Sequence, residues 1–207
     1  MTSEQLEARE SLRQADPVLR GIIDSIEFPS YPNTHDVFED LCSCILDMRI
    51  HYAGSNAAFR YKRLKKLMQG AAITPDFVLT NDPDYWGPLK LSRQKAESLK
   101  LWAEYWMEHG LDQVDWDAIS NEEVHDLLEP VKGVSRWTVL MILLFTLERP
   151  DEFPETDYQL KKAVCEVYGF EEDKKLPERM KELGNRWRPN RSLAVRCLWR
   201  WRQPVKS

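Results

Sequence analysis

The chain has 207 residues, a net charge of −5 and 30% charged side chains, and it contains only 8 glycines. This length suits one or two small helical domains with a sizeable core, and nothing in the chain demands two independent folds. The polar, acidic start at Met1 carries neither the apolar core of a signal peptide nor an arginine-rich transit pattern. We therefore expect a cytoplasmic protein in a bacterium or archaeon and a nuclear one in a eukaryote.

Alternation of β-branched residues is nearly absent, so the composition predicts an all-α fold. Proline, glycine and capping residues divide the first half of the chain into helices. Asp16 before Pro17 opens one of them, and Gly70 and Gly110 end two others. The helices expected in this half run from Pro17 to about Glu27, Asp36 to Arg49, Asn56 to Met68 and Ser92 to His109, with a short one after Thr74-Pro75.

The second half contains a long apolar segment. Ser120 and Glu123 form a capping-box pattern that starts a helix, and a short turn around Gly133 leads from that helix into residues 137–147. Residues 139–147 are all apolar but one, and a bilayer span needs roughly 20, so this segment predicts a buried core helix and no membrane partner. Further helices are expected from Asp157 to Tyr168, from Pro177, and after a cap at Asn190.

The turn between Val131 and Ser135 is a candidate binding element. Gly133 lets the backbone turn sharply and approach another surface closely, and the helix that follows directs its first free N–H groups toward the turn. Such a helix terminus attracts phosphate. On spacing alone, a plain αα-hairpin with glycine at its corner explains the pattern equally well.

Three separated stretches resemble the helix-hairpin-helix DNA glycosylase superfamily, most closely its 3-methyladenine DNA glycosylase II group. Residues 131–138, V-K-G-V-S-R-W-T, are similar to the hairpin pattern L-P-G-I-G-x-W-T-A. Residues 153–158, F-P-E-T-D-Y, resemble F-P-x-D-D-Y, and residues 186–192, R-W-R-P-N-R-S, resemble R-W-K-P-x-R-S. The likeness covers about residues 36 to 202. It implies two helical lobes with a DNA cleft between them.

The resemblance also implies how the chain is organised. We expect a single helical glycosylase unit over residues 1–207, without a separate β-domain, because the residues ahead of Asp36 contain too few strand-like runs to build one. Within this unit the helix-hairpin-helix would occupy about 121–147, the catalytic loop about 148–158, and basic C-terminal helices about 174–202.

Individual residues take their expected roles from the same likeness. Asp157, 24 positions after Gly133, would be the catalytic carboxylate, and Trp137 and Trp199 would form the pocket for the damaged base. An indole face attracts a cationic alkylated purine, although ordinary core packing is the alternative for each tryptophan. The residues expected to contact DNA are Gly133, Ser135, Lys132, Arg136 and Arg191.

The chain departs from the family pattern in the hairpin and in the segment that fills the gap left by a flipped base. Ser135 replaces the second hairpin glycine but keeps its backbone N–H, and Thr156 replaces the first carboxylate of the aspartate pair. Where many relatives carry paired glutamines, this chain reads D-M-R-I over residues 47–50. Arg49 aligns best with the wedge, while Met48 or Ile50 would serve if the turn were rotated by one residue. The alternative is that Arg49 contacts the DNA backbone or pairs with Asp47.

Cysteine spacing predicts no metal held by side chains. The four cysteines fit neither a zinc pattern nor a disulfide framework, and only Cys197 lies in the region where some relatives bind an iron–sulfur cluster. We therefore expect no cofactor and no iron–sulfur cluster, and we interpret the cysteines as small buried apolar residues. The resemblance allows a monovalent cation on the hairpin carbonyls. The remaining cysteines are Cys42, Cys44 and Cys165.

Basic residues are concentrated near the C-terminus, although the whole chain is acidic. Between Lys174 and Ser207 there are eleven basic residues and two acidic ones, a balance of +9, so the rest of the chain sums to −14. This segregation predicts a basic face that neutralises phosphates. A solvated pair of charged helices is the alternative. Together with the motifs, the basic face predicts double-stranded DNA that contains damaged bases as the partner. We expect the protein itself to be a monomer.

The chemistry implied by the resemblance is base excision in DNA repair. The damaged nucleotide must leave the duplex to be reached. Asp157 would then stabilise positive charge on the sugar and assist attack by water. It is equally suited to cap the helix that begins at Tyr158. Glycosylases that also cut the strand place a lysine just after the hairpin, where this chain has Trp137, so the expected enzyme is monofunctional.

We expect release of alkylated purines of the 3-methyladenine and 7-methylguanine type. Two alternatives remain open at this point. One is a glycosylase for oxidised or deaminated purines, since the pocket contacts that select a lesion cannot be placed from one sequence. The other is a helix-hairpin-helix protein that binds DNA without excising a base.

Overall fold

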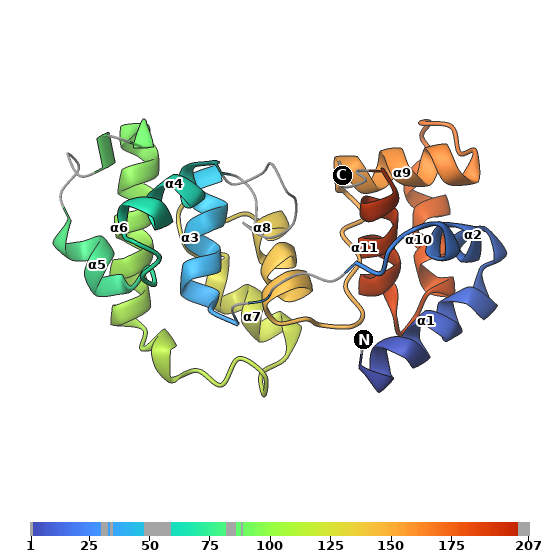
Figure 1. The fold of residues 1–207 in the computed structure, drawn as a ribbon, viewed down its shortest axis with the longest axis horizontal. Coiled ribbons are helices and arrows are strands. Elements are labelled where there is room, and N and C mark those ends of the chain that lie inside the picture. Colours follow the sequence, from blue (N-terminus) through green and yellow to red (C-terminus); the bar gives the residue numbers. More distant parts are fainter. Residues whose placement is uncertain are drawn as a thin grey trace. The chain divides into compact units, whose positions relative to one another are not determined.

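The computed structural model describes residues 2–29, 33, 35–47, 59–81, 86–87 and 89–202. Across these residues it contains helices and no strand, which confirms the all-α prediction (Figure 1). The chain forms two compact units. We call Tyr31–Glu148 the hairpin unit, and Met1–Ser30 together with Arg149–Ser207 the terminal unit. The proposed wedge Arg49, with Met48 and Ile50, lies outside the described residues.

Helix α3 is the centre of the hairpin unit. It packs against α4, α6 and the turn η3, and all its residues from Val37 to Leu46 are buried. Enclosure by several elements buries the polar side of this helix as well as its apolar side. The elements of this unit are α3 (Val37–Asp47), α4 (Phe59–Leu67), α5 (Pro75–Thr80), α6 (Arg93–Glu108), η2 (Leu111–Gln113), α7 (Asn121–Leu128), α8 (Arg136–Met141) and η3 (Ile142–Thr146).

The polar side of α3 can be buried because its carboxylates accept hydrogen bonds from neighbouring groups. Glu39 is 4% exposed and accepts hydrogen bonds from the Tyr61 hydroxyl, from Lys65 Nζ at 2.8 Å and from the Ile73 amide at 2.9 Å. Asp40 is fully buried and accepts from Thr146 Oγ1 at 2.7 Å. A buried carboxylate without such partners would be strongly destabilising, so these bonds hold α3 to its neighbours.

We expect Glu39→Gln to lower the free energy of unfolding at neutral pH by about 2 kcal/mol, because it removes charge-assisted hydrogen bonds in the core. Burial raises the pKa of Glu39, but the bonds from Lys65, Tyr61 and Ile73 outweigh it, so folding lowers that pKa. Stability from such a group is present above the unfolded-state pKa and is lost as pH falls through the folded-state pKa.

Denaturant unfolding of wild type and Glu39→Gln at neutral pH, and again well below the folded-state pKa, measures this difference. Glu104→Gln is the matched control, because Glu104 also pairs with a lysine but its side chain is 47% exposed. A destabilisation by Glu39→Gln that stays the same at both pH values would contradict the assignment.

The terminal unit is built around α11. This helix packs against α1, α2 and α9. The sequence indicated no helix before Pro17, yet a capping box between Thr2 and Gln5 starts one there. The elements of the unit are α1 (Ser3–Ala15), α2 (Pro17–Ser25), α9 (Tyr158–Tyr168), α10 (Leu176–Arg186) and α11 (Arg191–Arg202).

Asp16 joins three parts of the terminal unit. Its carboxylate caps α2 by accepting from the amides of Val18 and Leu19, both at 3.0 Å, as the sequence predicted. It also accepts from the Tyr168 hydroxyl at 2.8 Å and from Trp187 Nε1 at 3.0 Å. Asp16 is 3% exposed, so this local cap is also a buried tertiary contact.

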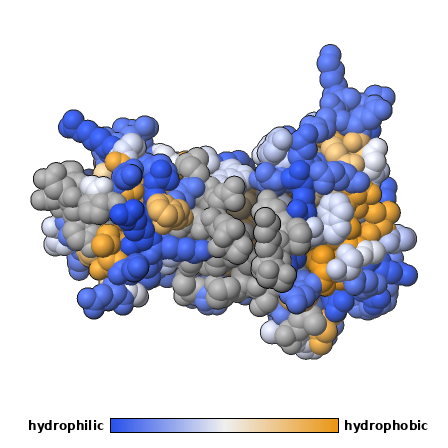
Figure 2. Space-filling model, turned by 45° about the horizontal axis from the view of Figure 1, so that its top comes forward, coloured by the Kyte–Doolittle hydropathy of each residue, from blue (hydrophilic) through white to orange (hydrophobic). Residues whose placement is uncertain are grey.

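Ion pairs offset part of the positive charge of the basic C-terminal stretch. Arg200 pairs with Glu27 at 3.0 Å, and Arg202 pairs with Glu166 at 3.1 Å. Both acidic partners lie outside the basic C-terminal stretch, so the fold brings negative charge to it. Figure 2 shows hydrophilic surface in both units interrupted by apolar patches. No helix among the described residues is both long and apolar enough to cross a membrane.

Candidate active site

The hairpin predicted around Gly133 is present. Helix α7 ends at Leu128, and α8 begins at Arg136. Gly133 has φ +93°, a conformation that L side chains rarely adopt, and a Cβ there would meet Ser98 Oγ of α6 at 3.3 Å. Glycine is therefore required both by the backbone and by the close approach of α6.

Ser135 starts α8 as its N-cap. The Thr138 amide donates to Ser135 Oγ at 3.3 Å, and the Ser135 amide donates to Thr138 Oγ1 at 3.4 Å, which completes a capping box. Across the turn, Arg136 Nη1 donates to Glu129 Oε1 at 3.2 Å, and His125 Nδ1 lies 2.6 Å from the same oxygen. Serine thus replaces the second hairpin glycine while supplying the helix cap.

The buried segment after the hairpin is less regular than predicted. Helix α8 passes at Ile142 into the π-helical turn η3, whose five residues are all buried. The Thr146 hydroxyl bonds to Asp40, and the Thr146 carbonyl accepts from Asn33 Nδ2 at 2.8 Å. A π-turn departs from the α-helical pattern of backbone hydrogen bonds and persists where other contacts fix it. The periodicity of apolar residues contains no signal for such a turn.

Asp157 is held in a defined direction at the start of α9. Its Oδ1 accepts from the Leu160 amide at 2.7 Å, which confirms the predicted N-cap, and from Trp199 Nε1 at 3.2 Å. Asp157 is 9% exposed. The terminal unit therefore brings together two residues singled out 42 positions apart, a carboxylate and the edge of an indole.

The other residues proposed from the sequence differ in accessibility. Lys132 is exposed, and the Arg136 side chain is 71% exposed, so both can reach a ligand from the hairpin. Trp137 is half-buried at the start of α8, in the hairpin unit. Arg191 is different, since its side chain is only 18% exposed and is paired with Asp151.

The described residues contain no group of His, Cys, Asp or Glu that could hold a metal ion. Cys42 and Cys44 lie buried in α3, where burial raises the pKa of both thiols. Burial also raises the pKa of Cys197 in α11 to about 12, and that of Cys165 in α9. The thiols are in their unreactive protonated form at neutral pH. The expected absence of an iron–sulfur cluster stays a prediction.

Comparison with known proteins identifies the family. The chain is 30% identical over 168 residues to DNA-3-methyladenine glycosylase 1 of Schizosaccharomyces pombe, covering 79% of this chain and 71% of that protein. The chain belongs to the DNA-3-methyladenine glycosylase family. It is also 25% identical to the alkylbase DNA glycosidase-like protein mag2 of the same yeast, covering 80% of this chain and 78% of the relative. No protein-family model matches.

A solved structure supports the same assignment. The structure of S. pombe 3-methyladenine DNA glycosylase Mag1 in complex with abasic DNA superposes with a TM-score of 0.75 at 25% identity, covering 94% of this chain and 95% of that one. The resemblance to helix-hairpin-helix glycosylases drawn from three short motifs is thereby confirmed.

Proposed function

We propose that this DNA-3-methyladenine glycosylase releases alkylated purines from double-stranded DNA by hydrolysing the N-glycosidic bond, with Asp157 as its catalytic carboxylate. The observation that carries the proposal is the pair of hydrogen bonds that hold Asp157 Oδ1, from the Leu160 amide and from Trp199 Nε1. A carboxylate fixed in this way needs little reorganisation when charge develops beside it.

The chemistry follows from the leaving group. Alkylation at N3 or N7 makes the purine cationic, so the bond to the sugar weakens without a separate acid. Positive charge then develops on the sugar, and the Asp157 carboxylate stabilises it and assists the attack of water. Trp199 holds the carboxylate through its N–H, and its half-buried indole offers a face on which a cationic purine can stack. Trp137, in the hairpin unit, is the second tryptophan that we propose binds the base.

Binding to the duplex is assigned to the hairpin. The backbone around Gly133 and Ser135 and the exposed side chains of Lys132 and Arg136 supply donors and positive charge for phosphate oxygens. A monovalent cation on the hairpin carbonyls would add to this charge. We propose that the protein acts as a monomer. It should lack strand-cleaving activity, because Trp137 stands where enzymes with that activity place a lysine.

Release of free base from a panel of duplexes, each with one lesion, tests the proposed function. We expect release from duplexes with 3-methyladenine or 7-methylguanine and an intact strand at the abasic product. Release of only oxidised or deaminated purines would favour the alternative substrate class. Binding without release of any base would identify a DNA-binding protein and contradict the proposal.

Two substitutions separate the roles of Trp199. Trp199→Phe keeps an aromatic face but removes the donor to Asp157, so we expect the single-turnover rate to fall roughly tenfold, the value of about one hydrogen bond. Trp199→Ala removes the stacking surface as well, so it should release base more slowly still. Relative to wild type, it should lose more affinity for lesion DNA than for undamaged DNA. If Trp199→Phe reacts at the wild-type rate, the bond to Asp157 has no catalytic role.

A further inference from the structure

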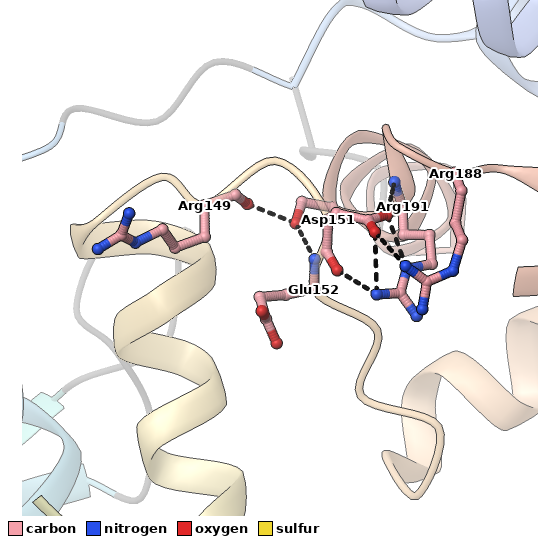
Figure 3. A network of polar contacts seen from close by, with 6 residues as sticks. Arg149, Asp151, Glu152, Arg188 and Arg191 are labelled. Carbon is pink, nitrogen blue, oxygen red and sulfur yellow. Dashed lines mark hydrogen bonds and ion pairs between the residues drawn. The ribbon is translucent and has the colours of Figure 1, made fainter. Parts of the chain in front are cut away.

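The loop that leads to Asp157 is bound at its start to the first turn of α11. Ser192 is 3% exposed, and its hydroxyl donates to the Arg149 carbonyl at 2.6 Å while accepting from the Glu152 amide at 2.8 Å. The Ser192 amide donates to the Pro150 carbonyl at 3.0 Å. Figure 3 shows that the side chains of Arg149 and Glu152 point away from these contacts, so the loop is held through its backbone.

A carboxylate on the same loop completes the attachment. Asp151 accepts from Arg191 in a two-pronged pair, Nε to Oδ1 at 2.7 Å and Nη2 to Oδ2 at 3.1 Å. Arg191 Nη2 also donates to the Asp151 carbonyl. Arg188 approaches the same carboxylate, with Nη1 2.7 Å from Oδ2 (Figure 3), but its side chain is 53% exposed.

The middle of the loop is fixed by apolar packing. Phe153 makes an edge contact with Trp187 at 5.8 Å between ring centroids. A Cβ on Gly184 would lie 3.0 Å from the Phe153 ring, so only glycine at that position in α10 allows the phenyl group to lie where it does. From residue 149 to Asp157, the loop therefore touches α10 and both ends of α11.

We infer that Asp151, Arg191 and Ser192 form a clamp that positions Asp157, and that Arg191 is a positioning residue of the enzyme. The inference rests on the proposed function, since it takes Asp157 as the catalytic group. It differs from the expectation that Arg191 contacts DNA. The clamp joins the loop to α11, the helix whose Trp199 holds the Asp157 carboxylate, so one rigid element fixes both the carboxylate and the indole.

The contacts of Arg191 favour a role in positioning Asp157 over a role in binding phosphate. An Arg fork engaged with both oxygens of one carboxylate has used the donors that suit a phosphate. Reaching DNA would require Arg191 to leave Asp151, a carboxylate whose side chain is 25% exposed. Among the described residues, the more exposed Arg188 would then be its remaining ion-pair partner. A displacement of about 1 Å at the reacting group can cost 10²-fold in rate, so loosening the loop should act on the chemical step.

The test compares Arg191→Gln, Asp151→Asn and the double variant with wild type. Single-turnover base release is measured at saturating enzyme, and the dissociation constant of duplex DNA is measured over a range of salt concentrations. We expect each single variant to release base roughly 10 to 100 times more slowly with an unchanged salt slope. The double variant should be no slower than either, because the residues act as one unit.

Two further variants calibrate this experiment. Arg188→Gln is the matched control, because it removes a cation from the same carboxylate at an exposed position, and its release rate should stay within a few-fold of wild type. Arg136→Gln shows what loss of a phosphate contact looks like, with a salt slope lower by about 1. If Arg191→Gln lowers the salt slope in the same way and keeps the saturated rate, the clamp is wrong.

Ser192→Ala tests the clamp if the variants of Arg191 or Asp151 do not fold. Ser192→Ala removes two hydrogen bonds from the loop without changing charge, and thermal unfolding reports the folded fraction to which each rate is normalised. A slower rate for folded Ser192→Ala supports the clamp, and a wild-type rate overturns it. Hydrogen exchange at the amides of residues 152, 153 and 155–157 does not depend on enzyme activity, and it should become faster in all clamp variants. If wild type releases no base from any duplex, the proposed function fails; unchanged exchange in the variants overturns the clamp separately.

Discussion

Asp157→Asn is expected to reduce the single-turnover rate of base release by roughly a thousandfold or more, because the neutral amide cannot stabilise the positive sugar. Asparagine is a good N-cap, and its carbonyl oxygen can accept from the Leu160 amide as the carboxylate does. The fold and most of the affinity for DNA should therefore be retained. The measurement is release of free base from a lesion duplex at saturating enzyme, with binding measured on the same duplex.

The matched control removes the same charge from the same loop. Glu155 is exposed and lies two residues before Asp157, so Glu155→Gln should react at close to the wild-type rate. A loss of rate in both variants would indicate a general effect of loop charge on the DNA. Comparable rates for Asp157→Asn and wild type would remove Asp157 from the mechanism.

Gly133→Ala is expected to weaken binding to all duplexes by roughly tenfold or more, with or without a lesion. The substitution places a Cβ at φ +93° and 3.3 Å from Ser98 Oγ, and backbone strain of this kind costs about 1–3 kcal/mol. Relief of the strain would shift the turn away from α6 and disturb the amides and side chains that meet phosphate. Because phosphate contacts carry no sequence information, the loss should be the same for every sequence.

Gly110→Ala separates strain from function. Gly110 has φ +60°, but a Cβ added there would have nothing within 4 Å, and the residue lies at the start of η2, outside the hairpin. Both variants should lower the thermal stability of the protein, while only Gly133→Ala should change the salt-dependent affinity for DNA. Equal losses of affinity in the two variants, or a loss confined to one DNA sequence, would argue against phosphate binding by the hairpin.

Features encoded by neighbouring residues could be predicted from the sequence. Asp16 before Pro17, Ser120 with Glu123, and Asp157 all cap helices as expected, and Gly169 ends α9 with φ +67°. Each of these signals depends on hydrogen bonds that span two to four residues, so a single chain contains all of the information. The turn around Gly133 was likewise located between two helices, one ending at Leu128 and the other beginning at Arg136, whereas the catalytic role of the loop before Asp157 stays a prediction.

Features that join distant residues were decided by the tertiary structure. The bond from Trp187 to Asp16 spans 171 positions, and the attachment of Arg191 to Asp151 spans 40. The family likeness assigned Arg191 to DNA contact, whereas the fold places the Asp151 carboxylate against it. Phe153 fits beside Gly184 only because two segments meet there.

The sequence by itself determined that this chain is helical, where its hairpin turns, and which carboxylate begins α9, because local hydrogen bonds and apolar periodicity are properties of consecutive residues. The tertiary structure alone decided that Trp199 lies against Asp157, that α3 is enclosed with its carboxylates hydrogen-bonded, and that Arg200 and Arg202 are paired with acidic residues from elsewhere in the chain. These contacts depend on which surfaces the core brings together. Many side chains compete for each partner, and the competition is settled only when the apolar faces have packed.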